Sequence, residues 1–118
     1  MAGRRREVRW SAAAEADLAD ILDYVAAERP LTAEKLLAQF RKRSSTLHEA
    51  ADRGRQVPEL LRQGISEYRE LVISVWRLIY RVHSDTVDVV MLLDARRDVE
   101  DLLLLRLTRG NTRKRSKE

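Results

Sequence analysis

Five arginines between Tyr68 and Arg97 are the main concentration of side chains that could bind a ligand. A guanidinium group stays protonated at neutral pH and presents a rigid fork of donors that suits phosphate or carboxylate. This clustering predicts a surface that binds an anionic target or partner. The competing interpretation is that the arginines form cross-strand ion pairs with Glu67, Glu70, Asp88 or Asp94. The five are Arg69, Arg77, Arg81, Arg96 and Arg97.

The sequence contains no other recognisable catalytic or metal-binding motif. It contains no cysteine, no HExxH motif and no glycine-rich phosphate loop. The two histidines, His48 and His83, are far apart, and a lone histidine needs an orienting partner to act as a base. Asp17, Asp20 and Asp23 recur every three residues, which is more typical of a solvated helix face than of a metal site. We therefore expect no metal and no cofactor.

The arginines belong to a segment that predicts three consecutive strands, beginning at Tyr68. Residues alternate along Val75–Val82, so Trp76, Leu78, Tyr80 and Val82 should share one face, while Arg77 and Arg81 point to the other. The next strand, Thr86–Asp94, is almost continuously apolar, which indicates a strand in the interior of a sheet.

Helices dominate the first half of the chain. After a short strand at Glu7–Trp10, an apolar stripe at helical spacing predicts a helix over Ala12–Ala27, which Pro30 stops. A second helix is predicted from Thr32 to Arg53, with Leu36, Leu37, Phe40, Leu47 and Ala51 on its apolar side. Gly54 is the predicted C-cap of this helix, and 54–64 is predicted to be an ordered loop. The short connection between the helices favours an antiparallel hairpin.

The last predicted helix, Val99–Leu107, contains four successive leucines. A helix turns by 100° per residue, so four neighbours cannot all face one core. We therefore expect Leu102, Leu103 and Leu104 to contribute to an interface. The complete prediction is an α+β fold in which a helical hairpin packs on a small, mainly antiparallel sheet, in the order β-α-α-β-β-β-α.

Composition and charge agree with one globular domain. The chain has 118 residues, of which 44% are hydrophobic, and a formal net charge of +4. We expect a single domain over 1–107 and a basic tail over 108–118. No apolar run approaches the roughly 20 residues of a membrane span, so no membrane association is expected. The absence of cysteine permits a cytoplasmic setting, which is the expected location.

Five short motifs together resemble the RelE/ParE superfamily of toxins from type II toxin–antitoxin systems. They occur in the family's order and spacing across about residues 7–107. The motifs are Trp10-Ser11, Gly54–Glu59 (GRQVPE), Arg69–Leu71 (REL), Trp76–Val82 (WRLIYRV) and Ala95–Asp98 (ARRD).

The resemblance implies a toxin that is neutralised by a cognate antitoxin and can form a hetero-oligomer with it. RelE-like members cut mRNA on the ribosome, whereas ParE-like members poison DNA gyrase. Arg77 and Arg97 match phosphate-binding positions of the nucleases, but Leu103 stands where a helical tyrosine would fall, and Glu70 interrupts a basic strand. The pattern is closer to ParE, which implies gyrase inhibition. A ribosome-dependent mRNA endonuclease and an inactive homologue acting as a binding module are the alternatives.

The resemblance also suggests where the antitoxin binds. We expect its C-terminal segment to lie as a helix along the apolar grooves next to the helical hairpin and the last helix. Its acidic side chains would meet Arg77 or Arg97.

Overall fold

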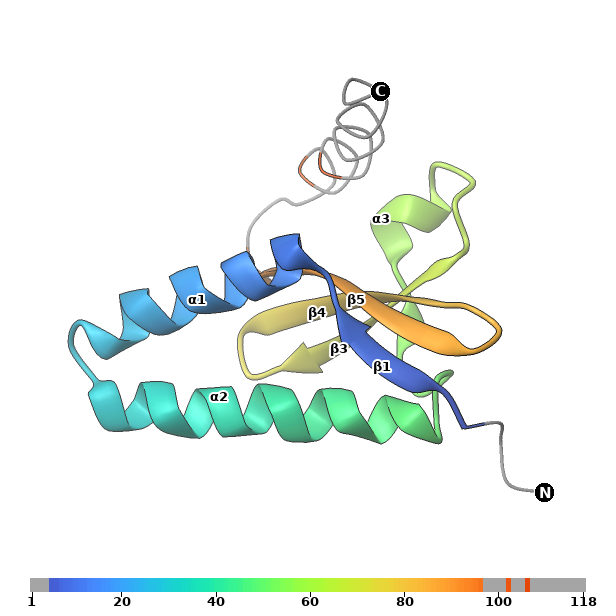
Figure 1. The fold of residues 1–118 in the computed structure, drawn as a ribbon. Coiled ribbons are helices and arrows are strands. Elements are labelled where there is room, and N and C mark those ends of the chain that lie inside the picture. The colour runs from blue at the N-terminus through green and yellow to red at the C-terminus, as the bar shows by residue number, and fades with distance from the viewer. Residues whose placement is uncertain (1–4, 97–101, 103–105, 107–118) are drawn as a thin grey trace, which may run out of the picture.

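The centre of the fold is a five-stranded sheet. The computed structural model describes residues 5–96, 102 and 106, and Figure 1 shows a helical hairpin along one side of the sheet. The strand order is β1-β5-β4-β3-β2. Strand β1 runs parallel to β5, and all other neighbours are antiparallel. The predicted α+β fold is confirmed. The strands are β1 Glu7–Trp10, β2 Arg55–Gln56, β3 Tyr68–Ile73, β4 Trp76–Val82 and β5 Thr86–Asp94.

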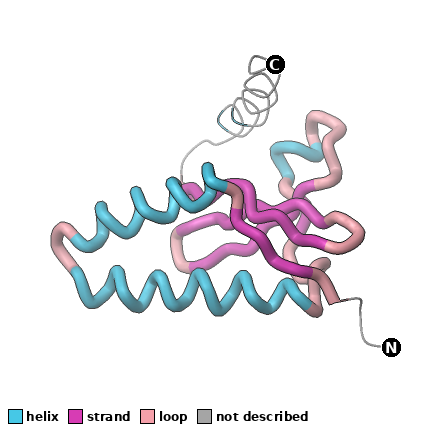
Figure 2. Tube along the Cα trace, viewed as in Figure 1, coloured by secondary structure: helices cyan, strands magenta, loops and turns pink. Residues whose placement is uncertain are grey.

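The hairpin consists of α1 (Ala12–Ala26) and α2 (Pro30–Ser45), which run side by side in opposite directions in Figure 2. Ser11 caps α1, because its hydroxyl oxygen accepts the backbone N–H of Ala14 at 3.0 Å. Helix α2 begins at Pro30 and not at the predicted Thr32. Proline has no N–H to donate, and the first turn of a helix needs none there.

The predicted end of the second helix at Arg53 is wrong. Helix α2 stops at Ser45, and a 3-10 turn, η1 (Thr46–His48), follows. The hydroxyls of Ser44, Ser45 and Thr46 each donate to a backbone carbonyl three residues earlier, and such local bonds compete with the regular helix. Gly54 therefore does not cap a helix.

The predicted faces of β4 are confirmed. Leu78 and Tyr80 are fully buried in the core cluster that contains the hairpin residues Leu18 and Phe40, and Trp76 packs against the same cluster. Ile79 belongs to a second cluster, with Val57, Leu60 and Met91, on the other side of the sheet. Leu37, predicted to lie on the apolar side of α2, is 36% exposed, so this assignment is corrected.

Residues 54–64 form more structure than the predicted ordered loop. Strand β2 (Arg55–Gln56) pairs with β3, and a short helix, α3 (Pro58–Leu61), follows. Pro58 is again in the first helical turn, where its missing N–H is tolerated. The predicted element order lacks η1, β2 and α3 and otherwise agrees as far as β5.

The final predicted helix falls largely outside the described residues. Within Val99–Leu107, only Leu102 and Arg106 are described, and both have helical conformation. The predicted boundary between domain and tail at 107 also lies outside the described part. Among the helices that are described, none combines the length and the apolar character needed to cross a membrane.

Candidate functional site

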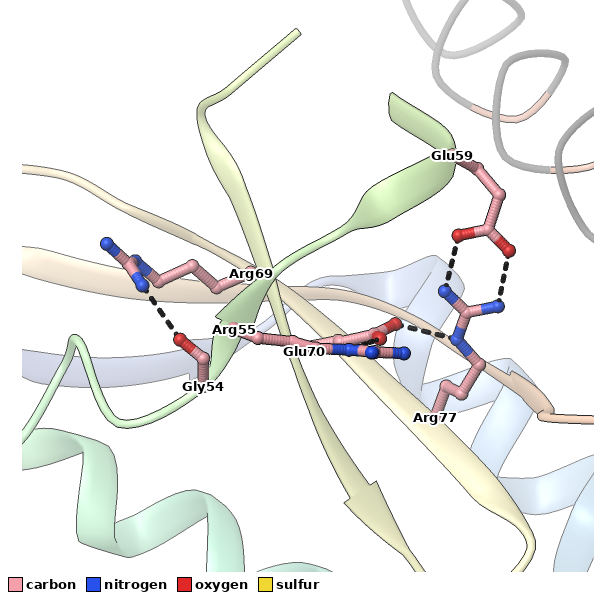
Figure 3. Close-up of polar contacts among 6 residues, drawn as sticks. All are labelled: Gly54, Arg55, Glu59, Arg69, Glu70 and Arg77. Carbon is pink, nitrogen blue, oxygen red and sulfur yellow. Dashed lines mark hydrogen bonds and ion pairs between the residues drawn. The ribbon is translucent and has the colours of Figure 1, made fainter. Parts of the chain in front are cut away.

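Arg77 on β4 is a buried arginine whose guanidinium group is hydrogen-bonded to two carboxylates. Its Nη1 and Nη2 atoms each donate to Glu59 at 2.7 Å, and its Nε atom donates to Glu70 at 2.6 Å. Figure 3 shows the guanidinium lying between the two acids. The residue is only 5% exposed. Arg77 is therefore neutralised within the chain and is not presented to an outside phosphate or carboxylate.

Glu70 on β3 links this pair to the edge of the sheet. Its side chain is fully buried and accepts Nε of Arg77 on one oxygen and Nε of Arg55 on the other, both at 2.6 Å. The Arg55 side chain is 64% exposed, so the cluster runs from the protein surface to its interior. We refer to Arg55, Glu59, Glu70 and Arg77 as the Arg77 cluster. Ion pairing, the competing interpretation of the sequence, describes Arg77 correctly.

Both partners of the ion pair between Arg77 and Glu59 stay charged. Hydrogen bonding to Glu59 raises the pKa of Arg77 above its usual value, and Glu70 adds to the same effect. Hydrogen bonding from Arg77 lowers the pKa of Glu59, with burial opposing this shift. The ion pair thus persists at neutral pH and joins α3 to the sheet.

The Tyr80 side chain lies on the opposite face of the sheet from Arg77. Its hydroxyl accepts the N–H of Gly54 and donates to the carbonyl of Ala51, both at 2.8 Å, and burial raises its pKa. Arg69 also holds this loop, because its Nη1 donates to the Gly54 carbonyl at 2.8 Å. A phenol engaged in this way anchors the 51–54 loop and is not available for proton transfer beside Arg77.

Among the predicted site residues that the structure describes, Arg69, Arg81 and Arg96 do not join the Arg77 cluster. Arg81 lies over the ring of Tyr68, with 5.7 Å to the centroid, and Arg96 pairs with Asp94 at 2.7 Å on the surface. Leu102 is 41% exposed. Arg97, Leu103 and Leu104 lie outside the described residues.

Sequence reasoning missed Glu59 and Arg55 as partners of the cluster. Glu59 lies in the segment predicted as a loop, and it meets Arg77 only because α3 folds back toward β4. The position of Glu59 directly after Pro58 is the sequence signal that could have found it. Pro58 begins a helix, and the helix dipole favours an acid in the first turn.

A groove of about 330 Å³ opens at the tip of the helical hairpin. It runs between the α1–α2 connection and the turn that joins β3 to β4. Tyr24 and Val75 line it and are 79% and 39% exposed. We call it the hairpin-tip groove, and its lining residues are Tyr24, Val25, Glu28, Arg29, Thr32, Leu36, Ser74, Val75 and Trp76.

Comparison with solved structures identifies similar folds. A chain of the chromosomal ParDE toxin–antitoxin system from P. aeruginosa is 19% identical, with a TM-score of 0.65, over 78% of this chain and 98% of that one. A chain of the RelBE2 toxin–antitoxin complex from Mycobacterium tuberculosis is 18% identical, with a TM-score of 0.51, over 77% and 92% of the two chains. No curated protein sequence matched the chain significantly.

The sequence itself matches a family model over most of its length. The model describes the ParE toxin of the type II toxin–antitoxin system parDE, and the match covers residues 8–99. This range includes the helical hairpin, all four members of the Arg77 cluster and the whole sheet apart from the first residue of β1. The chain belongs to the ParE toxin family of type II toxin–antitoxin systems.

Proposed function

We propose that the chain inhibits DNA gyrase and is neutralised by a cognate antitoxin. Membership of the ParE toxin family supports a toxin role. The observation that carries the choice of mechanism is the Arg77 cluster, because it commits the central arginine of the sheet to two internal carboxylates. Inhibition of gyrase requires a surface that binds the enzyme and no proton transfer by the toxin.

Cleavage of RNA would make greater demands on the site. In-line attack by a 2′-hydroxyl needs a base, an acid for the leaving oxygen and cations for the phosphate. Arg77 and Glu70 are bonded to each other, and Tyr80 is bonded to the 51–54 loop. These engaged groups favour a toxin that acts by binding.

The proposal predicts that purified toxin, separated from its antitoxin, blocks DNA supercoiling by gyrase. The assay follows conversion of relaxed plasmid to its supercoiled form while toxin is titrated in. Addition of the antitoxin in equal amount should restore supercoiling. Undiminished supercoiling at toxin concentrations well above that of gyrase would contradict the proposal.

A ribosome-dependent nuclease is the second candidate, and two arginines of the described sheet that lack a carboxylate partner favour it. Arg69 and Arg81 have no carboxylate partner among the described residues and remain able to contact phosphate. Primer extension on ribosome-bound mRNA distinguishes this candidate, and we expect the mRNA to stay intact. Codon-specific cuts that disappear in the Arg69→Ala or Arg81→Ala variant would establish the nuclease instead.

For the antitoxin we propose the hairpin-tip groove as a docking site for an amphipathic helix. Exposed aromatic and aliphatic side chains at a groove are typical contacts for such a helix. Arg29 at the rim has no carboxylate partner within the described part of the chain, so it complements an acidic residue of the antitoxin. Arg77 is less suited to this role than the sequence suggested, because Glu59 and Glu70 already neutralise it.

We therefore predict that Tyr24→Glu weakens antitoxin binding by at least about tenfold, since an aromatic anchor at an interface typically contributes more than about 1.4 kcal/mol. Titration calorimetry measures the affinity. Leu61→Glu is the matched control, because Leu61 is 42% exposed on α3 and does not line the groove. Equal affinities for wild type and both variants would remove the groove as the docking site.

A further inference from the structure

The turn that joins β3 to β4 consists of two residues that a tight hairpin does not favour. Strand pairing places Ile73 directly opposite Trp76, so Ser74 and Val75 alone make the connection. Ser74 has a φ of 59°, and no other described residue apart from glycine has a positive φ. A two-residue loop with a positive φ at its first position favours glycine there, because a side chain is strained in this conformation. The protein therefore retains strain at Ser74 that glycine would remove.

Val75 departs from the usual composition of a turn in a second way. Turns are rich in Gly, Pro, Asn, Asp and Ser, whereas a β-branched apolar residue is typical of a strand. Val75 is nevertheless an exposed residue of the turn. Its carbonyl accepts the N–H of Ala95 at 2.8 Å, so the turn is anchored on the segment that follows β5. An apolar side chain held in place at the surface is suited to binding, because little conformational entropy is lost when a rigid element meets a partner.

Both residues of the turn line the hairpin-tip groove. The helical hairpin contributes the apolar side chains of Val25 and Leu36 and the exposed ring of Tyr24 to the same groove. The Ser74 hydroxyl has no hydrogen-bond partner within the described part of the chain. Apolar side chains beside an unbonded hydroxyl match an amphipathic helix, which presents apolar and polar side chains next to each other. The two features of the turn that the hairpin does not need are thus the ones that the groove offers to a partner.

We propose that the Ser74–Val75 turn is a recognition element for the antitoxin. Val75 contacts the apolar face of the docked helix, and the Ser74 hydroxyl bonds to a polar group at the edge of that face. This inference rests on the docking site proposed above. The structural alternative is that the turn only connects β3 to β4. Glycine at position 74 separates the two roles, because a connecting turn gains stability without any effect on binding, whereas a recognition element gains stability and loses affinity.

Ser74→Gly tests the contribution of the hydroxyl. Glycine adopts the positive φ without strain, so the thermal midpoint should rise by about 3 °C. Antitoxin affinity, measured by titration calorimetry, should fall by about fivefold, the order expected for one lost hydrogen bond. A raised midpoint with unchanged affinity would overturn the role of Ser74 in recognition, and a lowered midpoint would contradict the strain on which the inference depends.

Val75→Thr tests the apolar contact and keeps the shape of the side chain. Threonine replaces one methyl group by a hydroxyl, which is costly to bury against an apolar helix face, so we expect antitoxin affinity to fall by about tenfold. Val72→Thr is the matched control, because Val72 is 49% exposed on the preceding strand and does not line the groove. It should bind the antitoxin like wild type. Equal affinities for the two threonine variants would overturn the role of Val75.

Comparison with Tyr24→Glu separates this inference from the docking site on which it rests. If Tyr24→Glu weakens antitoxin binding while Ser74→Gly and Val75→Thr bind like wild type, the groove stands as the docking site and the turn inference fails. If all three variants bind like wild type, the docking site fails as well. None of these measurements involves gyrase, so undiminished supercoiling in the presence of wild-type toxin would refute the proposed target and leave the role of the turn in antitoxin binding intact.

Discussion

Replacement of Arg77 by methionine is expected to lower the free energy of unfolding by about 3–5 kcal/mol, the usual cost of removing one partner of a buried ion pair. Methionine has a similar apolar volume but leaves Glu70 buried with one of its oxygens unpaired, and it leaves Glu59 without its two-pronged partner. Urea denaturation monitored by circular dichroism measures the change.

Arg55→Met is the matched control for this prediction. Arg55 contacts only one oxygen of the same buried carboxylate and its own side chain is 64% exposed, so we expect a smaller loss of about 1–2 kcal/mol. Combining Arg77→Met with Glu59→Gln and Glu70→Gln should recover part of the stability, because no unpaired buried charge then remains. Equal losses for Arg77→Met and Arg55→Met would contradict the buried pair.

The same pair predicts how stability depends on pH. Arg77 holds the pKa of Glu59 below its usual value near 4.5, so the folded state favours the ionised carboxylate more than the unfolded state does. The stabilisation is complete above the unfolded pKa and is lost as pH falls through the folded pKa. Wild-type stability should therefore fall below about pH 4.5 more steeply than that of Arg77→Met.

Gly54→Ala carries the second large expected effect. A Cβ atom at this position would lie 2.4 Å from the Glu70 carbonyl oxygen and 2.7 Å from the Tyr80 hydroxyl. The 51–54 loop must move away, and the bond from Gly54 N–H to Tyr80 is lost with it. We expect a cost of about 3 kcal/mol, at the upper end for an overpacked site, seen as a lower thermal midpoint.

Gly64→Ala is the control for Gly54→Ala, because it tests the cost of backbone strain without a steric clash. Gly64 has a φ of 79° but open space around its Cα atom, so alanine there meets backbone strain alone. This strain costs about 1–2 kcal/mol. A Gly54→Ala variant as stable as wild type, or more stable than Gly64→Ala, would contradict the close approach of the loop to β3 and β4.

Local patterns in the sequence were sufficient to predict the two helices of the hairpin, though not the end of the second, and four of the five strands. Alternation along Val75–Val82 placed Leu78 and Tyr80 in the core and Arg77 on the other face, because side-chain direction in a strand depends only on parity. Continuous apolar character likewise predicted an interior position for β5, which lies between β1 and β4.

Contacts between distant segments were not predictable in the same way. Arg77 and Glu59 are separated by 18 residues, and no periodic pattern indicates that α3 turns back to bring them together. Gly54 was predicted to be a helix cap from its local sequence, whereas its role comes from the approach of β3 and the Tyr80 hydroxyl. The count of arginines indicated charge on the sheet but not which carboxylates would neutralise it.

Trapping of cleaved DNA on gyrase is the most direct test of a ParE toxin that acts by binding. Gyrase and supercoiled plasmid are incubated with toxin, denatured with detergent and treated with protease, and the DNA is resolved on a gel. We predict linear plasmid that increases with toxin and disappears when the antitoxin is present. No linear plasmid at any toxin concentration, with cleavage of ribosome-bound mRNA by the same preparation, would contradict gyrase as the target.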